Sequence, residues 1–206
     1  MFQTMTIALR FCLVTLVLTG LAYPALVTGF AQLLFPWRAS GSPVKDERGA
    51  VVGSELLAQR FLSPAYFQPR PSAAGDGYDT NSSGGSNFGP TSAKLRNRVK
   101  ADIARLQKEN PAAAAPVPLE LVSASGSGLD PHLTPTAALW QVGRIAAARK
   151  VSPERVRALV ADREETPVPG IGGERRVNVL LLDLDLDRSF GRPALPVPAG
   201  APPGGK

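Results

Sequence analysis

The chain has 206 residues and a net charge of +6, with a single cysteine and a single histidine. One cysteine excludes a disulfide framework, and one histidine without another histidine or cysteine excludes the common zinc sites. The positive charge is spread over several segments and is not interleaved with aromatic residues, so nucleic-acid binding is not expected.

The first element in the chain is an apolar run, residues 11–35, that contains no charged residue. As a helix it would be roughly 37 Å long, against a bilayer core of about 30 Å. We therefore predict a transmembrane helix over residues 11–35, after a short amino-terminal segment, residues 1–10. Pro24 removes one backbone donor in mid-span, so we expect a kink there. The alternative is a cleaved secretory signal, but the apolar run continues past its cleavage site at residues 29–31.

One face of this helix carries small and weakly polar residues at spacings of three and four. Small side chains let helices approach closely in a membrane, so we predict that partner helices pack there, although such residues are also common in spans without partners. The residues of this face are Thr15, Thr19, Ala22, Ala25 and Gly29. Positive charges flank both ends of the span and do not decide its orientation. We expect a cytoplasmic amino terminus and a soluble domain outside the cytoplasm, because large domains translocate largely regardless of charge.

Residues 36–190 are predicted to form one soluble α+β domain, followed by a disordered Pro/Gly-rich tail, residues 191–206. A helix is expected from Ser92 to Asn110, because apolar residues recur on one face. Two more helices should begin at Thr134 and Ser152, each an N-cap residue followed by proline.

Two strands are also expected. One is a short apolar strand around Leu119. The other covers residues 177–187, where leucine and aspartate alternate, with a helix as the less favoured reading. In a strand, Asp183, Asp185 and Asp187 would lie on one face and could attract cations, though a solvent-facing edge is the simpler interpretation.

The residues offer no convincing catalytic centre, because the chain has no nucleophile beside a base and no set of metal ligands. The best remaining candidate is a Ser/Gly loop before the helix at Thr134, since backbone donors of such a loop can bind an anion or a nucleotide. Plain turns of this composition are more common. The residues of this possible nucleotide or partner loop are Ser123, Ser125, Gly126, Ser127 and Gly128, with Gln141 of the following helix.

Several motifs in order resemble the C subunit of the Kdp system, the bacterial ATP-driven potassium transporter. They are Tyr23-Pro24, FPWRASGS, QPRPSA, SGGSN, PVPLELVSASGSGLDPHLTP and AAxWQV, and they extend over nearly the whole chain. The Pro/Gly tail departs from the family pattern.

This resemblance implies a single-pass accessory subunit of a potassium-uptake complex in the inner membrane. Its expected partners are the lipid bilayer, a potassium-channel-like pore subunit and a P-type ATPase motor subunit. The chain contains neither a DKTGT-type phosphorylation site nor a TVGYG-like filter, so it is neither motor nor pore. The resemblance also implies a role in assembly and as a catalytic chaperone that raises the motor subunit's affinity for ATP, with ATP as a ligand and no tightly bound cofactor. The alternative is an independent membrane-anchored or secreted extracytoplasmic binding protein or enzyme.

Overall fold

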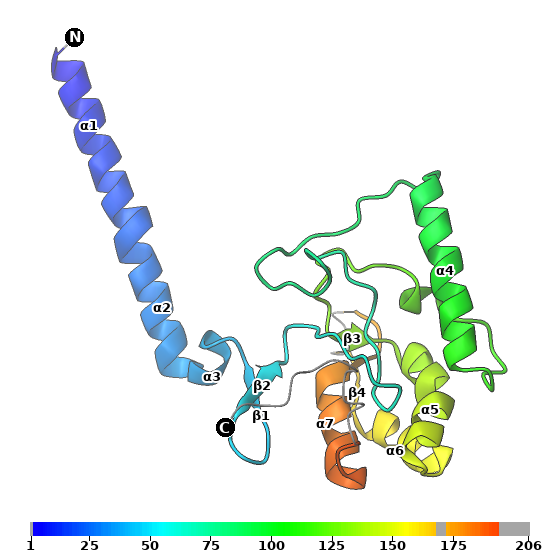
Figure 1. Cartoon of the computed structure of the whole chain (residues 1–206). Coiled ribbons are helices and arrows are strands. Elements are labelled where there is room, and N and C mark those ends of the chain that lie inside the picture. Colours follow the sequence, from blue (N-terminus) through cyan, green and yellow to red (C-terminus); the bar gives the residue numbers. More distant parts are fainter. Residues whose placement is uncertain (1, 168–171, 194–206) are drawn as a thin grey trace, which may run out of the picture. The chain divides into compact units, whose positions relative to one another are not determined.

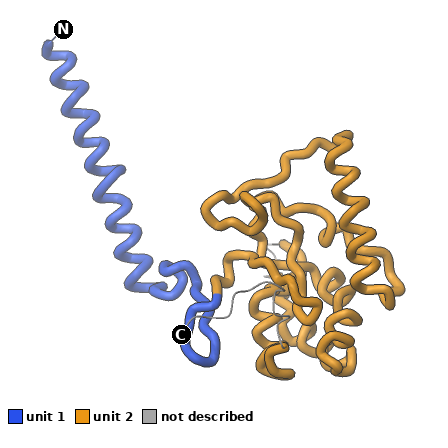
Figure 2. Tube along the Cα trace, viewed as in Figure 1, with its two compact units in different colours: residues 1–52 blue, residues 53–206 orange. Residues whose placement is uncertain are grey.

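The computed structural model describes residues 2–167 and 172–193. The chain divides into two compact units, residues 1–52 and residues 53–206 (Figure 2). Most of the predicted disordered tail, residues 194–206, lies outside the described residues.

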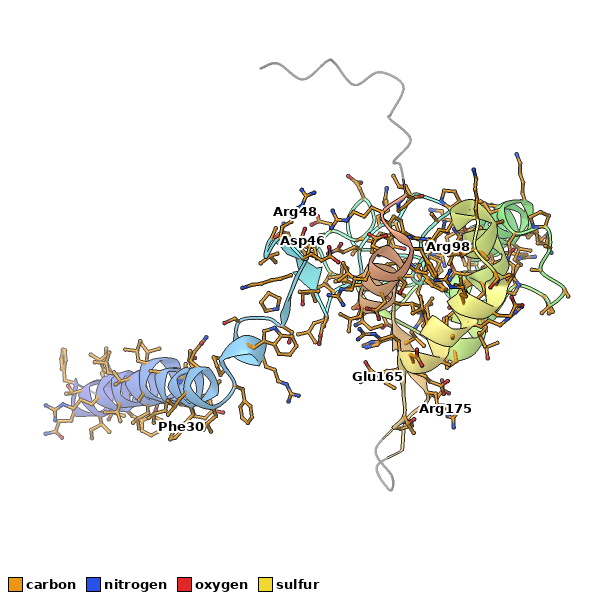
Figure 3. The ribbon with its side chains drawn as sticks, turned by 90° about the horizontal axis from the view of Figure 1, so that it is seen from below. Phe30, Asp46, Arg48, Arg98, Glu165 and Arg175 are labelled. Atoms are coloured by element: carbon orange, nitrogen blue, oxygen red, sulfur yellow. The ribbon has the colours of Figure 1, made fainter. Side chains whose placement is uncertain are left out.

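The first unit is dominated by one helix of 33 residues, Phe2–Leu34, which is long and apolar enough to cross a membrane. Its side chains point outward, as Phe30 does in Figure 3. The prediction of one amino-terminal helix of membrane-spanning length is confirmed, and the helix begins at Phe2 rather than at residue 11. Its parts are α1 (Phe2–Val17), the π-turn η1 (Leu18–Ala22) and α2 (Tyr23–Leu34).

The π-turn lies immediately before Pro24. The backbone N–H of Tyr23 donates to the carbonyl oxygen of Leu18, five residues back. Proline has no N–H and its ring crowds the carbonyl four residues earlier, so a wider turn at this point relieves the conflict. The sequence predicts a kink at this proline; the structure shows a π-turn immediately before it, and the kink itself stays a prediction.

A small hairpin follows the membrane helix, and the first unit ends at Val52, within its second strand. Asp46 organises its turn, because its Oδ1 accepts hydrogen bonds from the N–H groups of Arg48 at 2.9 Å and Ala50 at 3.0 Å. Figure 3 shows Asp46 and Arg48 together at this turn. The elements are α3 (Pro36–Ala39), β1 (Pro43–Lys45) and β2 (Val51–Ser54).

The second unit packs helices around a short antiparallel sheet of order β3-β5-β4 (Figure 1). Its core includes Phe67, Ile145 and Leu186, all with 0% of their surface exposed. These elements agree with the predicted α+β class. Their bounds are α4 (Ala93–Glu109), the 3-10 turn η2 (Leu119–Leu121), β3 (His132–Leu133), α5 (Pro135–Arg149), α6 (Pro153–Asp162), β4 (Glu164–Glu165), β5 (Arg176–Asn178) and α7 (Val179–Phe190).

Local capping fixes where these helices begin. Oγ of Ser92 accepts from the N–H of Leu95, and Oγ1 of Thr134 accepts from the N–H of Ala137. Each bond satisfies one of the donors that the first helical turn leaves free. The predicted starts of α4 and α5 are therefore confirmed, and α6 begins after Ser152 as predicted, although Ser152 makes no side-chain capping bond.

The predicted strand over residues 177–187 is wrong beyond Asn178. Oδ1 of Asn178 caps α7 by accepting from the N–H of Leu181 at 3.2 Å. Leucine is a strong helix former, and the buried positions of α7 recur at helical spacing. The three aspartates therefore do not share one face: Asp183 is buried, whereas Asp185 forms salt bridges with arginines. The short strand predicted around Leu119 is the 3-10 turn η2 instead.

Candidate functional site

The most elaborate polar arrangement in the second unit holds an irregular stretch, residues 64–68, which we call the clamped segment. Nη1 of Arg144 on α5 donates to the carbonyl oxygen of Pro64 at 2.7 Å. The amide of Gln141, one turn earlier, accepts from the N–H of Gln68 at 2.9 Å and donates to its carbonyl oxygen at 3.0 Å. Side chains thus satisfy partly buried backbone groups that a neighbouring strand would otherwise pair.

Asp183 binds the clamped segment from α7. Its Oδ1 accepts from the N–H of Phe67 at 2.8 Å, and Oδ2 has no hydrogen-bond partner among the described residues. Burial raises the pKa of Asp183 well above its ordinary value, against the opposing effects of the Phe67 N–H and of Arg149 and Arg144. Removing a carboxylate from water disfavours its charged form. The environment therefore favours the protonated acid.

Arg149 and Asp187 fasten the middle of the clamped segment. Arg149 donates to the carbonyl oxygen of Ala65 and to Oδ1 of Asp187, both at 2.8 Å. Oδ2 of Asp187 accepts from the Tyr66 hydroxyl at 3.0 Å, and the Arg149 guanidinium lies over the Tyr66 ring. Burial, followed by the hydrogen bond to Asp187, raises the pKa of Tyr66 to about 12. The phenol therefore keeps its proton and serves as a donor.

The predicted Ser/Gly loop packs against an earlier loop of the same unit. The N–H of Gly84 and the hydroxyl of Ser83 donate to the carbonyl oxygen of Ser127 at 2.8 and 2.9 Å. At Gly128, φ is +71° and a Cβ would lie 2.7 Å from the backbone nitrogen of Ala74. Only glycine fits this close approach without displacing the backbone.

Three of the predicted loop residues line one hollow, with Gly126 and Ser127 exposed and Ser125 buried. Ser125, Gly126 and Ser127 line a shallow hollow of about 430 Å³. A Cβ at Gly126 would meet nothing within 4 Å, so this position is open. Ser123 is not among the lining residues. The proposed nucleotide or partner role of the loop stays a prediction.

Gln141 does not join this hollow. Its side chain is 1% exposed, and its Oε1 also accepts from Arg144 at 2.8 Å. The amide that the sequence suggests as a ligand of the loop is bound to the clamped segment instead.

The arginines of the clamp were not predicted as site residues. Arg144 lies three residues after Gln141 on the buried stripe of α5, and it is only 7% exposed. A charged residue within an otherwise apolar helical stripe is the signal that could have identified it, because buried charges need partners.

The residues that could perform acid–base or metal chemistry are few. In residues 2–167 and 172–193, no group of three or more His, Cys, Asp or Glu side chains could hold a metal ion. Nδ1 of His132 lies 3.6 Å from Oδ1 of Asp130, and Arg70 lies 3.2 Å from Oδ2. The side-chain hydrogen bond from His132 is the main cause that lowers the pKa of Asp130. This arrangement stabilises a carboxylate and supplies no nucleophile.

The predicted partner face of the membrane helix is exposed along its length, at Thr15, Thr19, Ala22, Ala25 and Gly29. Oγ1 of Thr19 donates to the carbonyl oxygen of Thr15 at 2.8 Å, as threonine does inside apolar helices. A Cβ at Gly29 would meet nothing within 4 Å. The face is open to a neighbouring helix, and its use as an interface stays a prediction.

Comparison with known proteins settles the family. The sequence matches, over residues 5–188, the KdpC family model described as "K+-transporting ATPase, c chain". The chain belongs to the KdpC family. The match includes the membrane helix together with the clamped segment, the Ser/Gly loop and most of α7.

Relatives of this KdpC-family chain are similar over nearly their full length. The Potassium-transporting ATPase KdpC subunit of Myxococcus xanthus is 59% identical over 202 residues, which is 98% of this chain and 94% of that protein. The protein of the same name from Rhodospirillum rubrum is 48% identical, over 92% of this chain and 98% of its own length. That of Koribacter versatilis is 49% identical, over 90% and 93% of the two chains.

Proposed function

We propose that the chain is an accessory subunit of an ATP-driven potassium-uptake complex and has no catalytic site of its own. The family match over residues 5–188 carries this proposal, because it joins membrane helix and domain in one matched unit. The buried acid Asp183 and the buried Arg144 bind the backbone of the clamped segment, which gives these charged groups a structural role.

The proposed partners are a potassium-channel-like pore subunit and a P-type ATPase motor subunit. Helix Phe2–Leu34 is the proposed membrane contact, and its small-residue face leaves room for a neighbouring helix. We place the amino terminus in the cytoplasm and the second unit outside it. Protease added to intact spheroplasts should then cleave the second unit. Cleavage of the second unit only in inverted vesicles would show the opposite orientation.

The chain is further proposed to promote assembly and to raise the affinity of the motor subunit for ATP. With the second unit outside the cytoplasm, this effect has to pass through subunit contacts, since ATP is inside. If the second unit is cytoplasmic, the hollow at Gly126 becomes the place where the loop would contact ATP directly.

The test is co-expression of the three subunits and purification in detergent through a tag on the pore subunit. The chain should co-purify with both partners, and its omission should leave the motor subunit poorly retained. A pore and motor pair that assembles and transports potassium equally well without the chain would refute the accessory role.

The ATP effect has a separate measurement. The KM for ATP of the purified complex should be severalfold lower with the chain than without it. Gly126→Val adds bulk in the open hollow without touching the fold. A raised KM for ATP in this variant, with assembly unchanged, would support direct contact between the loop and ATP. An unchanged KM would leave only an effect transmitted through subunit contacts.

A further inference from the structure

Helix α4 has a strongly uneven charge along its length. Residues 84–101 contain four cations and no acidic residue, and all four lie in the first half of α4: Lys94, Arg96, Arg98 and Lys100. In the second half, Asp102 and Glu109 form salt bridges with Arg105. The two halves of one helix therefore differ by several charges.

The cations stand at the less favourable end of the helix. The amino terminus of a helix carries a partial positive charge, which acidic side chains usually offset. The first turn of α4 has no acidic residue. Positive side chains near the amino terminus of α4 therefore lower the stability of the helix, and a bound anion would offset this effect.

These cations are also available for binding. Among the described residues, Lys94, Arg96 and Lys100 form no salt bridge, and all three are exposed. Arg98, marked in Figure 3, lies over the ring of Phe88, and its buried Nε has no hydrogen-bond partner among the described residues. Figure 1 shows this half of α4 rising clear of the neighbouring helices.

The outward face of this half is small and flat. Val99 packs toward the core, so the residues on the opposite side of the helix, Ala93, Asn97 and Ala101, face solvent and are exposed. Helical spacing puts Lys94 with Arg98 on one flank of this face and Arg96 with Lys100 on the other. A smooth surface edged by two rows of cations suits a flat anionic surface, and it lacks the large apolar residues that would insert into one.

We propose that the basic half of α4, residues 93–101, docks on the anionic phospholipid headgroups of the bilayer that holds helix Phe2–Leu34. That helix tethers the second unit to a membrane, so the headgroups are present at high effective concentration whichever side the unit occupies. Lysine and arginine near an anionic leaflet are attracted to it individually, so weak contacts add up. The contact is electrostatic adsorption to headgroups without insertion.

The test is hydrogen exchange of residues 93–101 in the full chain, reconstituted into phosphatidylcholine vesicles with or without phosphatidylglycerol. Exchange should slow only in the anionic vesicles, and the protection should disappear near 1 M salt, where the Debye length is about 3 Å. The triple variant Lys94→Gln, Arg96→Gln and Lys100→Gln should lower the ratio of docked to undocked chain roughly a hundredfold, about fivefold for each cation.

A control variant removes three positive charges outside the basic half of α4. Lys45→Gln, Lys108→Gln and Arg157→Gln lie outside the basic half and should leave the protection intact. The proposal would be overturned if residues 93–101 exchanged equally in the two kinds of vesicle. It would also be overturned if the two triple variants lost protection from exchange to the same extent. Equal protection by dissolved phosphate, which would indicate an ion site, would overturn it as well, and so would protection only after partner subunits are added, which would indicate an acidic protein surface.

Discussion

Replacing Asp183 with asparagine should stabilise the second unit increasingly as the pH rises. An unfolded aspartate has a pKa of about 4, whereas burial raises the pKa of Asp183 well above its ordinary value in the folded chain. The folded state therefore binds the proton more tightly. This contributes stability that is present at low pH and lost as the pH rises through the folded pKa. Asparagine still accepts from the Phe67 N–H and cannot ionise. The Asp183→Asn variant therefore does not lose this stability as the pH rises.

The expected size follows from proton linkage. The difference in unfolding free energy between Asp183→Asn and the wild type should widen by up to about 1.4 kcal/mol per pH unit, until the pH passes the folded pKa. Arg149 and Arg144 favour the ionised acid and therefore shorten this window. Asp183→Leu removes the same titration but leaves the buried N–H of Phe67 without an acceptor, so it should be about 1–3 kcal/mol less stable than Asp183→Asn at every pH.

The assay is urea unfolding of the full chain in detergent at a series of pH values from about pH 5 upward, above the pKa of an unfolded aspartate. The chain has two tryptophans. With Trp37 replaced by phenylalanine, the fluorescence of Trp140, which is 8% exposed, reports on the core of the second unit. A stability difference that stays constant with pH, or one that shifts toward the wild type as pH rises, would refute the reasoning about Asp183.

Three further outcomes are expected. Ala25→Leu with Gly29→Leu should release the chain from a tagged pore subunit, while Val27→Leu, on the opposite side of α2, should not; equal retention would reduce the helix to a tether. Intact mass of the mature protein should include the amino-terminal helix, and a start at Gln32 would show a cleaved signal instead. Phe67→Ala should lower the unfolding free energy by about 3–5 kcal/mol, measured by the same urea titration, because this ring is wholly buried; a loss below about 1 kcal/mol would contradict its place in the core.

The helices were predictable where the signal is local. Ser92 and Thr134 cap their helices through side-chain bonds to residues three positions on, so sequence neighbours alone determine the start. The uncharged apolar run of the membrane helix is likewise recognisable without a tertiary partner, although the helix itself begins earlier, at Phe2, and includes Arg10. Local chemistry of this kind is fully visible in the sequence.

Helix α7 was missed because its decisive partner is distant in sequence. Alternating leucine and aspartate predicts a strand, and a helix with Asp183 in the core looks unfavourable from sequence alone. The N–H of Phe67, 116 residues away along the chain, makes the buried acid acceptable. Gln141 was misplaced for a similar reason, since its bonds to Gln68 join residues 73 positions apart. Spacing within one element cannot reveal such pairs.

The π-turn at Leu18–Ala22 also alters what the membrane helix can offer its neighbours. One additional residue in a turn rotates everything that follows by about 100° relative to an uninterrupted α-helix. Thr15 lies before the turn and Thr19 inside it, whereas Ala25 and Gly29 lie after it, so we expect the two pairs to form short patches that point in different directions. A straight neighbouring helix can lie along only one of them. If partner helices pack on these residues, as we propose, they should contact the span at two depths of the bilayer and from two directions.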